Sequence, residues 1–104
     1  MALTIGEVAT FANPKPDKQQ VLKIAEEYSE IYSAWENLQE VNAMYRYGNT
    51  DYSGKQFAIK KLVDECADTI TAVCNLLAAL GVDNNQMQRA MQDCEQRNRD
   101  RGRL

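Results

Sequence analysis

Apolar residues recur every three or four positions along most of this chain, and that spacing constrains the fold more than any other feature. It runs through two long stretches and resumes near the C-terminal end, whereas no segment alternates with period two. A period near 3.6 residues is that of an amphipathic helix, and a period of two would indicate a strand. The sequence therefore predicts an all-α fold.

Turn-forming residues divide this pattern into three helices. The helices are expected over 17–46, 55–80 and 84–101. In the short N-terminal segment 1–16, residues 3–12 could form a further short helix, which Asn13-Pro14-Lys15-Pro16 would end. The stretch 47–54 is rich in Gly, Asn, Asp and Ser and predicts a loop between the two long helices.

The expected helix ends carry capping residues. Asp17 is a plausible N-cap for the first helix, because its side chain can accept hydrogen bonds from free backbone N–H groups. Gly81 stands where a glycine typically ends a helix, and Asp83 or Asn84 would open the third. The short loop favours antiparallel long helices, which predicts an antiparallel helical bundle.

The expected inward faces follow from the apolar spacing. They are Val21, Ile24, Ala25, Tyr28, Ile31, Tyr32, Trp35 and Leu38 on the first helix, then Ile59, Leu62, Val63, Cys66, Ile70, Val73, Cys74, Leu77 and Leu80 on the second, and Met87, Ala90, Met91 and Cys94 on the third. Tyr28, Tyr32 and Trp35 could stack on a base, but their helical spacing favours a place in the core or a subunit interface. A chain of 104 residues forms one domain, 1–104, with a modest core. A homo-oligomer, dimer or tetramer, is therefore expected to complete it.

Composition excludes several classes of function. The net charge of -3 gives no general attraction to nucleic acid or to anionic lipid. The absence of a long apolar run and of a basic, apolar leader predicts a cytoplasmic protein outside the membrane. The three cysteines are an odd number without C-x-x-C spacing, so buried free thiols are expected. Because the chain has no histidine, His-dependent catalysis is excluded, and the usual zinc sites are nearly excluded, since three scattered cysteines make a poor tetrahedral set. A metal site would need oxygen ligands.

Two pairs of acidic residues supply such oxygen ligands. Glu27 and Glu30 are three apart on the first helix, and Glu65 and Asp68 are three apart on the second. Antiparallel packing would let the pairs face each other and hold a hard cation such as Mg²⁺. The alternative is that these acids form the solvated faces of amphipathic helices, and the spacing alone favours that alternative.

Basic residues provide candidate contacts for an anion. The inward stripe of the third helix continues beyond Cys94 to Asn98, and Arg101 follows, so this helix could deliver donors to phosphate. A frayed, arginine-rich tail is an equally good interpretation. Lys23 and Lys61 stand one turn before Glu27 and Glu65; either could reach a phosphate, although an exposed ion pair is the more common use.

These residues resemble the motifs of one known family. Glu26-Glu27-Tyr28-Ser29-Glu30 is similar to the E-E-x-x-E motif of the MazG-like, all-α nucleoside triphosphate pyrophosphohydrolases, and Glu65-Cys66-Ala67-Asp68 to that family's E-x-x-D. The segment DECADTITAVCNLLAALGVD resembles the family's second metal-binding helix, and CEQRNRDRG its Asn- and Arg-bearing end. The resemblance covers residues 20–103, with a longer stretch between the acidic motifs than is usual.

The resemblance implies Mg²⁺-dependent hydrolysis of a nucleoside triphosphate to the monophosphate and pyrophosphate, with Mn²⁺ as an alternative metal. The implied metal ligands are Glu27, Glu30, Glu65 and Asp68. Glu26 would orient water or support the ligands, and Asn98, Arg101 and Lys61 would contact the substrate.

Other functions stay open. Phosphoribosyl-ATP pyrophosphohydrolases are a related all-α family with similar acidic motifs. A non-catalytic helical module that associates through its apolar stripes is a second alternative. A di-iron carboxylate bundle usually needs E-x-x-H pairs, which a chain without histidine cannot supply.

Overall fold

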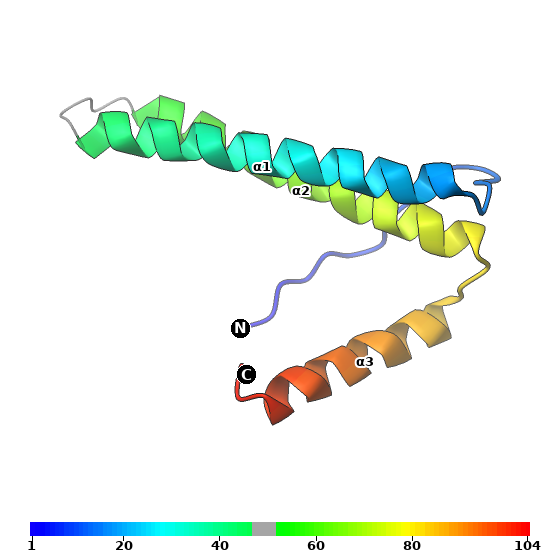
Figure 1. Ribbon diagram of the computed structural model, residues 1–104. Helices are drawn as coiled ribbons and strands as arrows, with labels where there is room; N and C mark the ends of the chain where they lie inside the picture. Colours follow the sequence, from blue (N-terminus) through cyan, green and yellow to red (C-terminus); the bar gives the residue numbers. More distant parts are fainter. Residues whose placement is uncertain (47–51) are drawn as a thin grey trace.

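The described part of the protein forms three α-helices. The computed structural model describes residues 1–46 and 52–104, and within them it contains no strand. The helices are α1 (Lys18–Arg46), α2 (Tyr52–Ala79) and α3 (Asn84–Asp100) (Figure 1). The predicted all-α class is confirmed.

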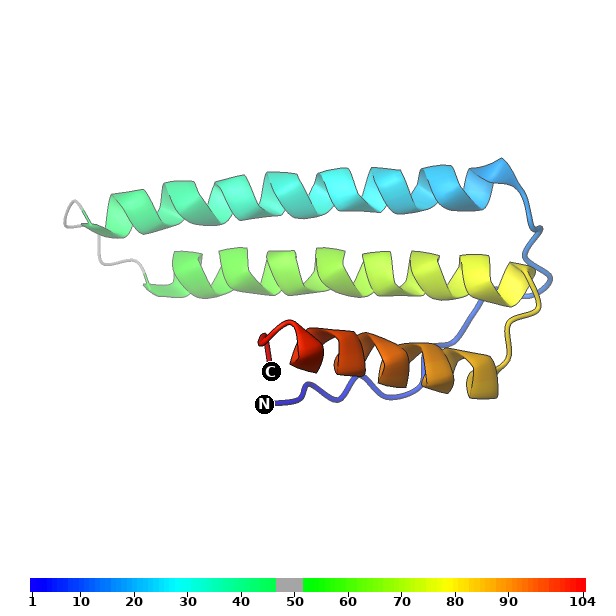
Figure 2. The same ribbon diagram turned by 60° about the horizontal axis from the view of Figure 1, so that its bottom comes forward.

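α1 and α2 form an antiparallel pair, and α3 stands apart from them. Figures 1 and 2 show α1 and α2 side by side over most of their length, with α3 turning back from the end of α2. In the described part of the chain, no Cα atom of α3 lies within 8 Å of a Cα atom of α1 or α2. One chain thus forms a helical hairpin with a separate third helix, and the completed bundle stays a prediction.

The helix ends follow the expected capping residues. Gln19 donates its backbone N–H to Asp17 Oδ1 at 3.0 Å, which confirms Asp17 as the N-cap of α1. Gly81 has φ of +75°, and the N–H of Val82 bonds to the carbonyl of Leu77 at 3.0 Å, as in a Schellman C-cap. Asp83 and Gln86 form a capping box that opens α3.

The second long helix begins earlier than expected. α2 begins at Tyr52, so 52–54 belong to its first turn and the prediction of a loop there is wrong. Ser and Gly are tolerated in a first turn, because backbone N–H groups there have no partner within the helix. The rest of the expected loop, 47–51, lies outside the described residues.

The N-terminal segment 1–16 is not helical, so the prediction of a short helix over 3–12 is wrong. A helix of this length is marginal without packing, and Gly6 adopts φ of +81°, outside the helical region. The segment instead contacts α2, where the Phe11 N–H donates to Asn75 Oδ1 at 2.8 Å. Asn75 is itself buried.

The interface between α1 and α2 is a regular seam of seven positions on each helix. These positions are all buried or half-buried: Gln20, Ile24, Glu27, Ile31, Ala34, Leu38 and Val41 on α1, and Ala58, Leu62, Glu65, Thr69, Ala72, Leu76 and Ala79 on α2. They alternate three- and four-residue steps, as in the seam of a coiled coil. We call this set the hairpin seam.

The hairpin seam buries little apolar volume. Its buried apolar side chains are Ala34, Leu38, Ala58 and Ala72, and α3 has no buried residue. Much of the predicted inward face therefore lies outside the core: Tyr28, Tyr32 and Trp35 are at least half exposed, and so is Met91 on α3. Alanine at three of the four positions lets the two helix backbones approach closely.

Cys66, Cys74 and Cys94 are free thiols, but they are half-buried rather than buried, because the faces that carry them are only partly covered. Among the described helices, none combines the length and the apolar character that crossing a membrane requires.

Candidate metal centre

Four carboxylates from two helices meet at the middle of the hairpin seam. Glu27 and Glu30 of α1 and Glu65 and Asp68 of α2 each offer one oxygen, and these oxygens all lie within 4.8 Å of one another. Glu27 and Glu65 occupy seam positions and are only 7% exposed, whereas Glu30 and Asp68 are open to solvent. The structure thus brings together the four predicted ligands, with one buried and one accessible carboxylate from each helix.

Each buried glutamate has one paired oxygen and one unpaired oxygen. Lys23 Nζ lies 3.0 Å from Glu27 Oε1, and Lys61 Nζ lies 2.9 Å from Glu65 Oε1. The Oε2 atoms of Glu27 and Glu65 are buried without a hydrogen-bond partner. Leaving a buried carboxylate oxygen unpartnered is costly, so these atoms need a proton donor or a cation.

The charges of the cluster favour a divalent cation. Four carboxylates and the two lysines leave a net charge of minus two, which one Mg²⁺ or Mn²⁺ would balance. Oxygen-only ligands suit a hard cation of this kind. The two unpartnered buried oxygens and the excess negative charge of the cluster both fit the divalent metal that the sequence motifs imply.

The pKa of Glu30 reflects the same excess of negative charge. The pKa of Glu30 rises to about 7, first because a protonated Glu30 can hydrogen-bond to Glu65 and second because the charge of Glu27 disfavours ionisation. The pKa of Glu65 is lowered, chiefly by its hydrogen bond to Lys61 and then by that to Glu30. Without a cation, a proton on Glu30 relieves the repulsion within the cluster.

This pKa predicts how the stability of the metal-free protein depends on pH. Between Glu30's ordinary pKa of 4.5 and about 7, the folded chain holds a proton that the unfolded chain has lost. The contribution of Glu30 to stability is therefore present below the ordinary pKa and is lost as the pH rises through about 7. Glu65 does not change the pH dependence of stability in this pH range, because its lowered pKa leaves it ionised in the folded and the unfolded chain.

We expect the melting temperature in EDTA to fall between about pH 5 and about pH 7.5, measured by circular dichroism. Glu30→Gln, which cannot titrate, should flatten this decline. Excess Mg²⁺ should restore stability at the higher pH by replacing the proton. A wild-type profile in EDTA that matches the Glu30→Gln profile would contradict the described electrostatics.

The two halves of the site repeat a pattern that the sequence analysis did not detect. Lys23, Glu26, Glu27 and Glu30 on α1 correspond to Lys61, Asp64, Glu65 and Asp68 on α2, each 38 positions later. The seven positions of the hairpin seam repeat with the same offset. Hydrophobic spacing hides this repeat because Glu27 and Glu65 stand at positions where an apolar residue is expected.

The other predicted site residues on the hairpin lie beside the carboxylates. Lys61 pairs with Glu65, so its ion pair is present whether or not it also contacts a substrate. Glu26 is exposed and lies 3.6 Å from Lys23 Nζ, next to the buried Glu27. These positions are compatible with the implied supporting roles, which stay predictions.

Asn98 and Arg101 do not join the cluster within one chain. They lie at the end of α3, which has no close backbone approach to α1 or α2 in the described residues. Asn98 accepts a hydrogen bond at Oδ1 from Arg103 at 3.3 Å and donates to Cys94 Sγ at 3.8 Å. The backbone N–H of Arg101 bonds to the carbonyl of Arg97. Their implied phosphate contacts would require α3 to move or a second chain to supply them.

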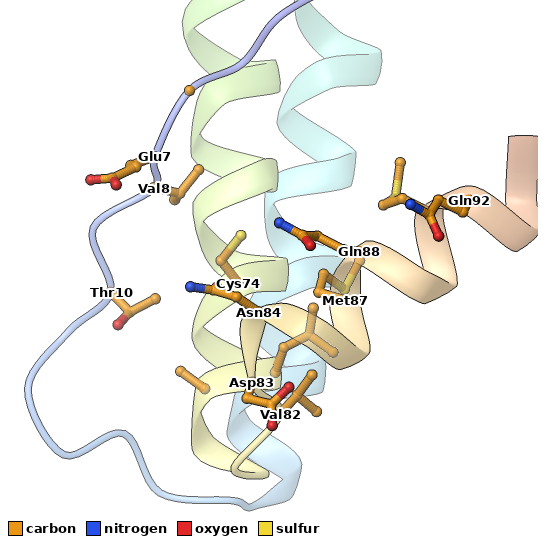
Figure 3. A pocket seen from close by; sticks show the side chains of 14 residues that line it. Glu7, Val8, Thr10, Cys74, Val82, Asp83, Asn84, Met87, Gln88 and Gln92 are labelled. Carbon is orange, nitrogen blue, oxygen red and sulfur yellow. The ribbon is translucent and has the colours of Figure 1, made fainter.

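A separate open groove of about 910 Å³ lies between the N-terminal segment, the end of α2 and the start of α3. Figure 3 shows Val8, Cys74 and Met87 pointing into it, with Glu7 and Gln88 nearby. Of the described residues that line it, none is lysine or arginine, and none is a cluster carboxylate. Its described lining therefore includes neither the predicted metal ligands nor a cation that could pair with a triphosphate.

Comparison with protein-family models, with curated proteins and with solved structures gives no match for this chain. The resemblance to the MazG-like family therefore rests on the sequence motifs alone.

Proposed function

We propose that this protein is a Mg²⁺-dependent hydrolase that cleaves a nucleoside triphosphate to the monophosphate and pyrophosphate. Two features support the proposal: the resemblance of the acidic motifs to the MazG-like pyrophosphohydrolases and the arrangement of their side chains. The proposal includes a homo-oligomer in the cytoplasm that acts on a free nucleotide rather than on nucleic acid.

The unpartnered buried oxygens of Glu27 and Glu65 carry the proposal. A solvated acidic face, the simplest alternative, would leave its carboxylates in water with no desolvation cost. Here two glutamates stand inside a helix interface, each only 7% exposed. A lysine neutralises only one oxygen of each. An arrangement that costs stability in the metal-free protein is typical of a functional site.

The chain's own residues divide the work in this proposal. Glu27, Glu30, Glu65 and Asp68 would bind the metal, and Lys23 and Lys61 would hold the two buried glutamates in position. Glu26 would orient a water molecule, while Asn98, Arg101 and Lys61 would bind phosphate oxygens. Mg²⁺ bound there would neutralise phosphate charge, favouring attack by water at the α-phosphorus. None of these roles needs a histidine or a covalent nucleophile.

A pyrophosphate-release assay tests this function. The purified protein is given a panel of ribo- and deoxynucleoside triphosphates, and phosphoribosyl-ATP, with Mg²⁺ or with excess EDTA. We expect metal-dependent release of pyrophosphate from at least one nucleoside triphosphate. Excess inorganic pyrophosphatase, added in a parallel reaction, verifies that the product is pyrophosphate rather than phosphate released stepwise.

Two results would contradict the proposed substrate. Release from phosphoribosyl-ATP alone would assign the protein to the related pyrophosphohydrolase activity. No release from any substrate, with the protein helical by circular dichroism, would favour a non-catalytic helical module.

A further inference from the structure

The accessible carboxylates lie on one side of the hairpin, which we call the carboxylate face. It has a row of residues on each helix, and each α2 residue follows its α1 counterpart by 38 positions: Glu30, Ser33 and Asn37 on α1, and Asp68, Thr71 and Asn75 on α2. Steps of three and four residues keep each row within about 60° around its helix. Oxygens of Glu30 and Asp68 lie within 4.8 Å of each other, so both rows are on the same side of the hairpin.

The N-terminal segment covers one end of the carboxylate face. Asn37 is exposed to solvent, whereas its counterpart Asn75 is only 3% exposed. The backbone N–H of Phe11 donates to Asn75 Oδ1 at 2.8 Å. Figure 3 shows the segment running beside α2 at Val8 and Thr10. The two halves of the hairpin therefore differ here, because the segment borders the carboxylate face at the α2 end.

Phe11 has an anchored backbone and an exposed side chain. Burying the amide of Asn75 is costly without a hydrogen bond, and the bond from Phe11 supplies one. This bond fixes the position of Phe11 in a segment that is neither helix nor strand. The Phe11 side chain is nevertheless 68% exposed, so it contributes little to the core. An aromatic ring held in this way is accessible to a ligand.

The anchor of Phe11 lies at a short distance from the carboxylate cluster. Asn75 follows Asp68 by seven residues, which places it about 20° around α2 and about 10.5 Å along it. A nucleotide whose phosphates are bound at the cluster extends its ribose and base away from the metal. Two helical turns along the carboxylate face are a distance that a ribose and a base can span.

We propose that Phe11 stacks on the nucleobase of the nucleotide whose phosphates bind at the carboxylate cluster, with Asn75 as the residue that positions Phe11. The inference rests on the proposed function and adds to it a site for the base. Aromatic side chains stack on any base, because every base has a π-face. Stacking on Phe11 therefore strengthens the binding of nucleotides in general and does not select one base.

A second exposed phenylalanine provides a matched control. Phe57 is 70% exposed and precedes Asp64 by seven residues on α2. It lies towards the opposite end of the hairpin, because it is 18 positions before Asn75 on the same helix. Phe11 and Phe57 thus carry the same ring with similar exposure, and only Phe11 is hydrogen-bonded through its backbone to Asn75.

The test is isothermal titration calorimetry with Mg²⁺ on the full chain, which needs no hydrolysis. The ligands are α,β-methylene nucleoside triphosphates, which resist cleavage at the α-phosphorus, and inorganic tripolyphosphate, which has no base. Phe11→Ala should weaken nucleotide binding about 10-fold or more and leave tripolyphosphate binding unchanged. Asn75→Ala should act in the same direction. Phe11→Tyr, which keeps the ring, and Phe57→Ala should bind the nucleotides as the wild type does.

The pattern across the two ligands identifies the failures. Equal weakening of nucleotide and tripolyphosphate by Phe11→Ala would overturn the base site and leave the N-terminal segment a structural role. Weakening by Phe57→Ala but not by Phe11→Ala would place the base at the other end and overturn it too. Equal wild-type affinity for both ligands would exclude a contact with the base but keep the phosphate site. Binding of neither ligand would contradict the proposed function itself. Circular dichroism verifies that each variant is folded.

Discussion

Replacing Glu30 by Gln, or Asp68 by Asn, should reduce pyrophosphate release by about 100-fold or more. Substitutions of residues that merely support metal ligands typically cost about 10- to 100-fold, and these two carboxylates are expected to be ligands themselves. Each replacement keeps the size of the side chain and removes one charge from the cluster. Both residues are exposed to solvent, so the helices should fold normally. Initial rates at saturating Mg²⁺ and nucleotide measure the effect.

Matched controls separate loss of a ligand from loss of a surface charge. Glu36→Gln on α1 and Asp64→Asn on α2 make the same chemical changes at exposed positions on the same helices. Asp64 is directly beside Glu65 and pairs with Lys60 at 2.9 Å, outside the four-carboxylate cluster. Both controls should keep nearly the wild-type rate. Equal rates for Glu30→Gln, Asp68→Asn and their controls would show that the cluster is not the catalytic centre.

The double variant Glu27→Leu/Glu65→Leu should melt several degrees above the wild type in EDTA and have no measurable activity. Replacing buried charged groups by apolar side chains of similar size is often neutral or stabilising, because the desolvation cost disappears. Both positions lie in the hairpin seam, where Leu continues the pattern set by Ile24 and Leu62. Mg²⁺ should no longer raise the melting temperature.

A control variant with the same change in net charge tests whether the rise in melting temperature comes from the buried positions. Glu36→Leu/Asp64→Leu also removes two acids, but from exposed positions, and should leave both the stability and the Mg²⁺ response close to wild type. A lower melting temperature for Glu27→Leu/Glu65→Leu would contradict the account. It would show that the buried glutamates stabilise the hairpin through Lys23 and Lys61, as a structural ion-pair network does.

The features that could be predicted from sequence are those that depend on local chemistry. Helix ends are set by a few neighbouring residues, so Asp17, Gly81 and Asp83 identified them without knowledge of the packing. Local spacing also identified the two pairs of carboxylates, because three-residue steps place side chains on one side of a helix. The antiparallel arrangement of α1 and α2 then brings the two pairs together (Figure 2). The resemblance to the MazG-like motifs, and not the spacing, favoured a metal site over a solvated acidic face.

Packing between elements was harder to predict. Ile24 and Leu38, which lie in the hairpin seam, and Tyr28 and Trp35, which lie on the exposed face, all have helical spacing and form one broad stripe in the sequence. Only the position of α2 determines which of these residues are buried in the hairpin seam and which stay exposed. The burial of Glu27 was missed because acids are ordinarily expected at the surface.

The placement of α3 could not be predicted from its own residues. Its stripe of Met87, Met91 and Cys94 indicates a face to bury, but the pattern does not identify the surface that buries it. Asn98 and Arg101 were therefore expected near the carboxylates, and in the single chain they are not there.

The most direct test of the metal centre is a Mn²⁺ titration followed by electron paramagnetic resonance at neutral pH, comparing the wild type with Glu27→Leu/Glu65→Leu. Free Mn²⁺ gives a sharp signal that is lost on binding, so the assay needs neither substrate nor turnover. We predict saturable binding to the wild type, competed by Mg²⁺, and none to the variant. Equal binding to both folded proteins, or to neither, would contradict the claim that the four carboxylates hold a divalent cation.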